Sequence, residues 1–105
     1  MKISIITATY NSVSTLKNTL NSLHSQKFKN FEHIIIDGGS SDGTIDLIKN
    51  NKNNFTTFIS EPDNGIYDAL NKGISLAKGQ IIGFLHSDDI LSNNNILTQI
   101  NNSFN

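Results

Sequence analysis

The sequence predicts an α/β fold, in which helices cover both faces of a mainly parallel, Rossmann-like sheet. Three observations support this prediction. Short runs of β-branched or apolar residues alternate with segments of helical periodicity, the alternation continues along the chain, and turns rich in glycine or polar residues separate the segments. Strands and helices in alternation are typical of parallel sheets, because the chain has to cross the sheet between successive strands. We expect residues 1–105 to form a single domain.

Four segments are predicted to form strands. The runs at 3–9 and 31–36 are rich in isoleucine and have the length of buried strands. The run at 55–59 is followed by the turn SEPDNG, and the run at 81–85 ends abruptly in the polar residues HSDD. A polar turn is therefore expected at the end of each strand.

Four segments are predicted to form helices, because apolar residues recur at every third or fourth position within 13–23, 45–48, 66–77 and 96–104. Asn11, Ser12 or Ser14 is available to cap the first helix, and Asp42 to cap the second. The third is expected to end near Gly79. Its apolar stripe consists of Ile66, Leu70, Ile74 and Ala77.

Composition and charge exclude several classes of function. With 105 residues and a formal net charge of −1, the chain has no basic excess for binding the phosphate backbone of nucleic acids. It contains no cysteine, which excludes disulfides and thiol chemistry and agrees with a reducing compartment. The apolar run after Met1 is too short to span a bilayer and lacks the features of a signal peptide. We therefore expect a cytoplasmic globular protein.

Polar side chains follow every predicted strand. In parallel sheets, ligands bind in the crevice beyond the carboxyl ends of the strands. One polar strand end is ordinary turn chemistry, but carboxylates follow three of the four strands here. The sequence therefore predicts a binding pocket at this edge of the sheet, formed by Thr9, Tyr10, Asn11, Asp37, Glu61, Asp63 and the residues from His86 to Asp89.

Asp88 and Asp89 are adjacent, and neighbouring carboxylates repel each other unless a cation neutralises them. Their oxygens suit Mg²⁺ or Mn²⁺, and the imidazole of His86 suits Mn²⁺. A metal held by one or two carboxylates keeps its other positions for water and substrate phosphates, which indicates a nucleotide-linked substrate. The alternative is that one of the two acids caps the following turn.

Two long segments carry a resemblance to a known family: ISIITATYNSVSTLKNTLNSLHSQKFKNFEHIIIDGGSSDGT and SEPDNGIYDALNKGISLAKGQIIGFLHSDD. Together they resemble the amino-terminal half of family 2 glycosyltransferases with the GT-A fold, from Ile3 to Asp89. The stretch EPDNGIYDALNKG is similar to bacterial enzymes of capsule, colanic-acid or lipopolysaccharide synthesis. The resemblance implies a truncated GT-A domain that holds the half binding the nucleotide-sugar donor, with the acceptor half absent.

The resemblance implies nucleotide contacts for several residues. Thr9 and Tyr10, with Asn11 beside them, would line the base, and Asp37 would hydrogen-bond uracil or another base. Asn71 matches a position often seen in the family and would face the donor. Asp63 is instead expected to serve in a turn or cap. Asp68 and Lys72, four residues apart on the third helix, are expected to form a surface ion pair.

The resemblance also implies a metal site. Asp88 and Asp89 would fall in a DxD-type motif that contacts the ribose, through Asp88, and the divalent metal (Mn²⁺ or Mg²⁺) bridging the donor diphosphate. His86, a further candidate ligand, stands where many relatives have an acid. Two other departures are Gly38, where many relatives have a second acid, and Leu70, which replaces a common arginine.

The expected function is transfer of a sugar from a nucleotide-diphosphate donor, most simply a UDP-sugar, to a glycan or lipid-linked acceptor. The resemblance implies inversion at the sugar and a place in bacterial cell-surface polysaccharide synthesis. The general base is expected beyond residue 105, so the alternative is a truncated, non-catalytic module that binds nucleotide or metal. No nucleic-acid partner is expected. Association with the cytoplasmic face of the inner membrane and homo-oligomerisation through an exposed sheet edge are further expectations.

Overall fold

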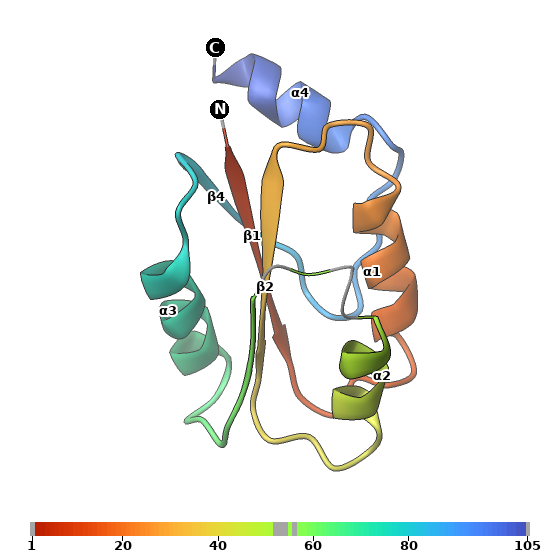
Figure 1. Ribbon diagram of the computed structural model, residues 1–105, viewed down its shortest axis with the longest axis vertical. Coiled ribbons are helices and arrows are strands. Elements are labelled where there is room, and N and C mark those ends of the chain that lie inside the picture. Colours follow the sequence, from red (N-terminus) through yellow and green to blue (C-terminus); the bar gives the residue numbers. More distant parts are fainter. Residues whose placement is uncertain (1, 52–54, 56, 105) are drawn as a thin grey trace.

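A four-stranded parallel sheet with the strand order β3-β2-β1-β4 lies at the centre of the molecule (Figure 1). The computed structural model describes residues 2–51, 55 and 57–104. Its strands are β1 (Ile3–Thr9), β2 (Phe31–Asp37), β3 (Thr57–Ser60) and β4 (Ile81–Phe84), and its helices are α1 (Leu16–His24), α2 (Thr44–Asn50), α3 (Ile66–Leu76) and α4 (Ile96–Ser103). The predicted α/β class and parallel sheet are confirmed.

The first helix begins at Leu16 rather than near Val13, because the preceding residues are held in a loop by the β2–α2 connection. The Ser12 N–H donates to Thr44 Oγ1 at 2.8 Å and the Val13 N–H donates to Asp42 Oδ2 at 3.2 Å. The N-cap residue is Thr15, which makes no side-chain capping bond. The prediction that Asn11, Ser12 or Ser14 caps this helix is therefore wrong.

Asp42 does act at the start of α2, although Gly43 is the N-cap residue. Asp42 Oδ1 accepts the Thr44 N–H at 3.0 Å and the Thr44 hydroxyl at 2.5 Å. The third strand was predicted at 55–59 and begins at Thr57, while residue 56 lies outside the described residues. The remaining predicted elements form within two residues of their expected ends, except that α3 ends at Leu76, with Ala77 as its C-cap residue, and not near Gly79.

Helices cover both faces of the sheet, as predicted, with α3 on one face and the other helices opposite (Figure 1). Because side chains alternate along a strand, odd-numbered positions such as Ile5 and Ile35 pack against α1, α2 and α4. Even-numbered positions such as Ile6 and Ile34 pack beneath α3. The core therefore consists of two layers, one on each side of β1 and β2.

Helix α3 contacts the sheet through its small residues. Ala69 and Gly73, one turn apart, are its buried positions, whereas Ile66 and Ile74 are 47% and 43% exposed. A Cβ added at Gly73 would overlap with Cγ2 of Ile6, so the helix lies as close to β1 as a glycine allows. Of the apolar stripe that marks this helix, Leu70 and Ala77 pack against the core, whereas Ile66 and Ile74 remain largely exposed.

The strand order reverses once, between β1 and β4. The chain proceeds from β1 to β2 and β3 in one direction, and then crosses back to pair β4 with the other edge of β1. Right-handed crossovers put α3, which spans the return, on the opposite face from α1 and α2. In open α/β sheets, the carboxyl ends of the strands at such a reversal flank the ligand-binding crevice.

Strand β4 is an edge of the sheet and is covered on one face only. Ile82 and Phe84 point to the face of α3 but remain 42% and 48% exposed, because α3 lies over β1 and β2. Their exposure agrees with the expected apolar sheet edge. The self-association expected from that edge stays a prediction.

A buried carboxylate fixes the amino-terminal end of the sheet. Glu32 on β2, 3% exposed, accepts the Ser4 hydroxyl at 2.5 Å and the Lys78 N–H at 2.6 Å on one oxygen. The Ser4 hydroxyl oxygen in turn accepts the Gly79 N–H at 2.8 Å. These four residues tie the connection between α3 and β4 to the two central strands.

Candidate functional site

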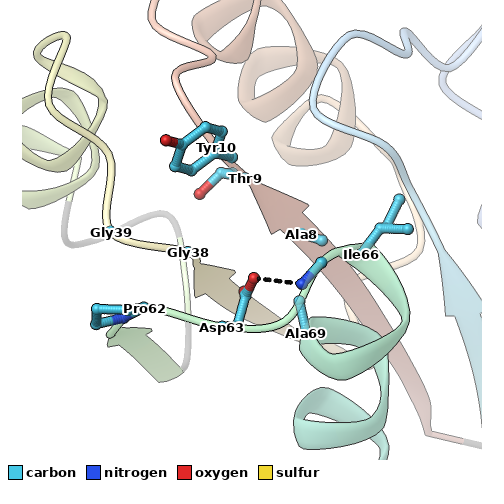
Figure 2. Close-up of a pocket in the computed structure, with 10 residues that line it drawn as sticks. Ala8, Thr9, Tyr10, Gly38, Gly39, Pro62, Asp63, Ile66 and Ala69 are labelled. Carbon is cyan, nitrogen blue, oxygen red and sulfur yellow. Dashed lines mark hydrogen bonds between the residues drawn. The ribbon is translucent and has the colours of Figure 1, made fainter.

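A cavity of about 610 Å³ opens at the carboxyl ends of β1 and β2, beside the first turn of α3 (Figure 2). Its volume lies in the range of pockets that bind small molecules, roughly 300–1,000 Å³. It lies at the edge of the sheet where the sequence predicts a pocket. The residues that line it are Ala8, Thr9, Tyr10, Gly38, Gly39, Pro62, Asp63, Gly65, Ile66 and Ala69.

Thr9 and Tyr10 both line this cavity, but they contribute differently (Figure 2). Tyr10 is 65% exposed, so its ring offers an aromatic surface on which a planar group can stack. Thr9 is 3% exposed, and its hydroxyl donates to Asp37 Oδ1 at 2.7 Å. Tyr10 is therefore available to a ligand, whereas the Thr9 hydroxyl is used inside the protein.

Asp37 is fully buried behind the cavity and accepts five hydrogen bonds from the protein. Oδ1 accepts the hydroxyls of Thr9 at 2.7 Å and Ser40 at 2.6 Å. Oδ2 accepts the backbone N–H groups of Gly39 at 3.0 Å and Ser40 at 2.9 Å, and the Ser60 hydroxyl at 2.9 Å. Burial raises the pKa of Asp37, but these hydrogen bonds outweigh it and hold the pKa below its usual range.

These bonds define what Asp37 does in this structure. A carboxylate has about four lone-pair sites, so five donors use its capacity completely. Asp37 therefore shapes the Gly38–Ser40 segment that forms one wall of the cavity. The direct hydrogen bond to a base that the resemblance implies would require one of these donors to be exchanged, and it stays a prediction.

Asn11 joins the two loops at this edge of the sheet. Its φ angle of 48° lies in the left-handed region, which asparagine tolerates better than most residues. Its side-chain oxygen accepts the Ser41 N–H at 2.9 Å, and its own N–H donates to Ser40 Oγ at 2.8 Å. Asn11 joins the loops without lining the cavity, and its nucleotide contact stays a prediction.

Asp63, which the sequence analysis placed both at the expected pocket and in a turn, lines the cavity. The turn is present, because Asp63 Oδ1 accepts the Gly65 N–H at 3.0 Å, the bond drawn in Figure 2. Its carboxylate also faces Gly38, since a Cβ added there would lie 2.9 Å from Asp63 Oδ2.

The turn after β4 distinguishes the two neighbouring acids. Asp89 closes it: its N–H donates to the His86 carbonyl at 3.0 Å, and its Oδ2 accepts the His86 N–H at 3.2 Å. Asp88 is exposed, and no described residue hydrogen-bonds its carboxylate. The alternative in which one acid caps the turn therefore applies to Asp89, and Asp88 is the acid that is free to bind a ligand.

The structure does not bring Asn71 to the cavity. Asn71 lies two residues from each of the buried positions Ala69 and Gly73, which at about 100° per residue turns its side chain away from the sheet. It is exposed and is absent from the cavity wall. The contact of Asn71 with the nucleotide stays a prediction.

The predicted ion pair on α3 is confirmed and extended. Lys72 Nζ lies 3.6 Å from Asp68 Oδ2 and 2.9 Å from Glu61 Oε1, so it joins α3 to the segment after β3. The Glu61 carboxylate raises the pKa of Lys72. Glu61 was expected to line the pocket, and it instead pairs with Lys72 outside the cavity wall.

The described residues contain no group of three or more His, Asp or Glu side chains that could hold a metal by themselves. A hard divalent cation does not need such a group, since Mg²⁺ commonly binds through one or two carboxylates and takes its other ligands from water and phosphates. Asp88 offers one unengaged carboxylate of this kind. The residues present therefore fit a cation that arrives with a phosphate ligand.

Within residues 2–51, 55 and 57–104, no helix has the length and apolar character needed to cross a membrane.

Comparison with known proteins shows the family and the fold of this chain. The model of the family described as glycosyl transferase family 2 matches residues 4–102. An uncharacterized glycosyltransferase of Mycobacterium tuberculosis is 39% identical over 98 residues, covering 92% of this chain and 37% of that protein. A PGL/p-HBAD biosynthesis glycosyltransferase of Mycobacterium bovis is 36% identical over 104 residues, covering 92% and 39%. The chain therefore spans less than half the length of these relatives.

Solved structures show the same fold. Staphylococcus aureus TarS, residues 1–349 in complex with UDP-GlcNAc, superimposes with a TM-score of 0.89 and 29% identity over 97% of this chain and 30% of that one. A mannosyltransferase of Pyrobaculum calidifontis, in complex with GDP-Man and Mn²⁺, superimposes with a TM-score of 0.83 at 22% identity over 90% of this chain and 30% of that one. The four-stranded sheet and its helices thus have the arrangement of GT-A glycosyltransferases.

Proposed function

The chain belongs to glycosyl transferase family 2, and from that membership we propose that it binds the nucleotide-sugar donor of a sugar-transfer reaction. The observation that carries the proposal is the cavity at the carboxyl ends of β1 and β2, which has the volume of a small-molecule site and an exposed tyrosine at its mouth. A uridine diphosphate donor is proposed because TarS, at 29% identity, was solved with UDP-GlcNAc.

In this proposal the base occupies the cavity. The Tyr10 ring stacks on it, and the Asp63 carboxylate, the one charged group among the described residues of the cavity wall, accepts the imino N–H of uracil. Asp37 supports both by holding the Gly38–Ser40 segment in place. The ribose and diphosphate then extend toward the turn after β4, where Asp88 is free.

Asp88, with His86 and Asp89 as further candidate ligands in the same turn, would hold a divalent cation, Mn²⁺ or Mg²⁺. Such a cation neutralises the charge that the diphosphate leaving group gains during transfer. The role of this chain's own residues is to bind and orient the donor, since a fixed geometry lowers the entropic part of the barrier. No general base is assigned among the described residues.

We further propose a glycan or lipid-linked acceptor in bacterial cell-surface polysaccharide synthesis, with inversion at the transferred sugar. The resemblance of EPDNGIYDALNKG to enzymes of that synthesis supports this class of acceptor. Action at the cytoplasmic face of the membrane follows from such an acceptor.

Calorimetric titration with UDP, with Mn²⁺ and with chelator, tests the donor site. We expect UDP to bind in the presence of Mn²⁺ and at least about tenfold more weakly in chelator, because a cation has to neutralise the diphosphate beside Asp88. Asp88→Asn should give the same loss, whereas Asp46→Asn, which removes an exposed carboxylate from α2, should not. Equal affinity in chelator would refute the metal role, and absence of UDP binding under all conditions would refute the proposed function.

A further inference from the structure

Three hydroxyl groups converge on a single residue, Ser87, in the turn that follows β4. The hydroxyls of Thr15 and Thr19 both donate to the Ser87 carbonyl, at 2.9 and 3.0 Å. The Ser12 hydroxyl donates to Ser87 Oγ at 2.9 Å. All three donors lie in the β1–α1 loop or on α1, at least 68 residues before Ser87 in the sequence.

These threonines differ from ordinary helical threonines. A threonine in a helix commonly returns its hydroxyl to the carbonyl of a preceding turn of the same helix. Thr19 is fully buried, on a helix face that otherwise carries leucines such as Leu16 and Leu20, and its hydroxyl instead reaches across to another segment. The Thr15 hydroxyl also bonds to the Ser87 carbonyl, at a shorter distance than its 3.5 Å contact with the Ser12 carbonyl.

The geometry at the Ser87 carbonyl determines where Asp88 lies. A carbonyl oxygen has two lone pairs, and the two threonine hydroxyls use both. The peptide bond is planar, so the Ser87 carbonyl and the Asp88 nitrogen and Cα lie in one plane. Two donors that fix the oxygen from α1 therefore fix the orientation of the peptide that carries Asp88.

The same contacts connect the acidic turn to the cavity. The Ser12 hydroxyl, besides contacting Ser87, accepts the Tyr10 N–H at 3.3 Å. Tyr10 lines the cavity, whereas Asp88 does not. The β1–α1 loop thus holds the exposed aromatic ring and the free carboxylate in one hydrogen-bonded unit.

We propose that Thr15 and Thr19 are positioning residues for Asp88: by holding the Ser87–Asp88 peptide, they place the carboxylate to receive a cation and the diphosphate of a nucleotide. The inference rests on the proposed function and adds residues outside the cavity wall to it. Partners that orient a metal-binding side chain commonly affect metal affinity by 10–100-fold when they are removed.

The test uses paired substitutions of the same threonines. Thr15→Val with Thr19→Val removes both hydroxyls and keeps the β-branched shape, whereas Thr15→Ser with Thr19→Ser keeps both hydroxyls. We expect the valine variant to lose about tenfold or more in affinity for UDP in the presence of Mn²⁺, measured by calorimetry. Its affinity for uridine, which lacks phosphates, should stay unchanged in an NMR titration, and the serine variant should restore UDP binding.

A matched control separates positioning from general damage. Thr7→Val also removes a buried threonine hydroxyl. Thr7 lies on β1, away from the acidic turn, and its hydroxyl is 2.8 Å from Nε2 of His33 on β2. This variant should leave Mn²⁺-dependent UDP binding intact. If the double valine variant is too unstable, the single Thr15→Val variant, at a half-buried position, takes its place. Unchanged UDP affinity, or equal losses for UDP and uridine, would overturn the inference, whereas a wild-type chain that binds neither ligand would overturn the proposed function itself.

Discussion

A buried carboxylate of β2 accepts hydrogen bonds at each end of the sheet, but the two carboxylates connect different segments. At the amino-terminal end, Glu32 accepts a serine hydroxyl and a backbone N–H. At the carboxyl-terminal end, Asp37 on the same strand accepts hydroxyl and N–H groups in the same way. Both carboxylates are buried, on opposite faces of β2.

The difference lies in which segments donate to each carboxylate. The donors of Glu32 belong to β1 and to the α3–β4 connection, and neither of them lines the cavity. The donors of Asp37 come from β1, from β3 and from the segment Gly39–Ser40, and two of them, Thr9 and Gly39, line the cavity. A buried, hydrogen-bonded carboxylate is therefore no evidence of function by itself, and the candidate site is identified by the cavity beside Asp37.

Asp37→Ala should have the largest effect in this comparison. It leaves several buried donors without an acceptor, so we expect the free energy of unfolding to fall by about 2–4 kcal/mol, and UDP binding to be lost with the cavity wall. Urea denaturation and calorimetry measure the two effects. Asp37→Asn, which keeps the shape, should lose less of both, and retention of full stability by Asp37→Ala would contradict the structural role.

Glu32→Gln should have a smaller effect and should separate stability from binding. The amide weakens the bonds from Ser4 and Lys78, so we expect a loss of about 1–3 kcal/mol in the free energy of unfolding. UDP affinity should remain that of the wild type at temperatures where the variant is folded, because Glu32 lies at the other end of the sheet. A fall in affinity that exceeds the unfolded fraction would show that the two ends are coupled.

Acid should weaken the hydrogen bonds of both carboxylates, Glu32 and Asp37. The resulting loss of stability should be the smallest of the effects expected here. Burial raises the pKa of each carboxyl, but hydrogen bonds outweigh it, and the pKa values of Asp37 and Glu32 are lowered on folding. The resulting stabilisation is complete above the unfolded values, about 3.9 for Asp and 4.3 for Glu, and is lost as the pH falls through the folded values. Urea denaturation between pH 6 and pH 3 should show declining stability, with a shallower decline in Glu32→Gln. A flat profile would contradict both assignments.

The order of the elements and the edge of the sheet that carries the cavity could be predicted, because strand periodicity and parallel topology are local and general rules. The partners of Asp37 could not, since Ser40 and Ser60 are brought to it by two different loops. Nor could the sequence decide which of Asp88 and Asp89 closes the turn, because that depends on the backbone of a few residues.

The face that α3 turns toward the sheet could not be read from its large apolar residues. Leu70 and Ala77 of the apolar stripe do pack against the core, but the residues that the helix buries most completely are Ala69 and Gly73. Small residues carry little hydrophobic signal, yet they allow the closest approach.

The missing side chain at Gly73 sets a spacing. Ile66 and Ala69, in the turns before Gly73, form part of the cavity wall, and Gly73 itself rests on Ile6 of β1. The absence of a single methyl group thus fixes the distance between the helix and the sheet, and with it the width of the cavity. A larger residue at this position would have to displace either Ile6 or the helix, so the shape of the cavity depends on a residue that does not line it.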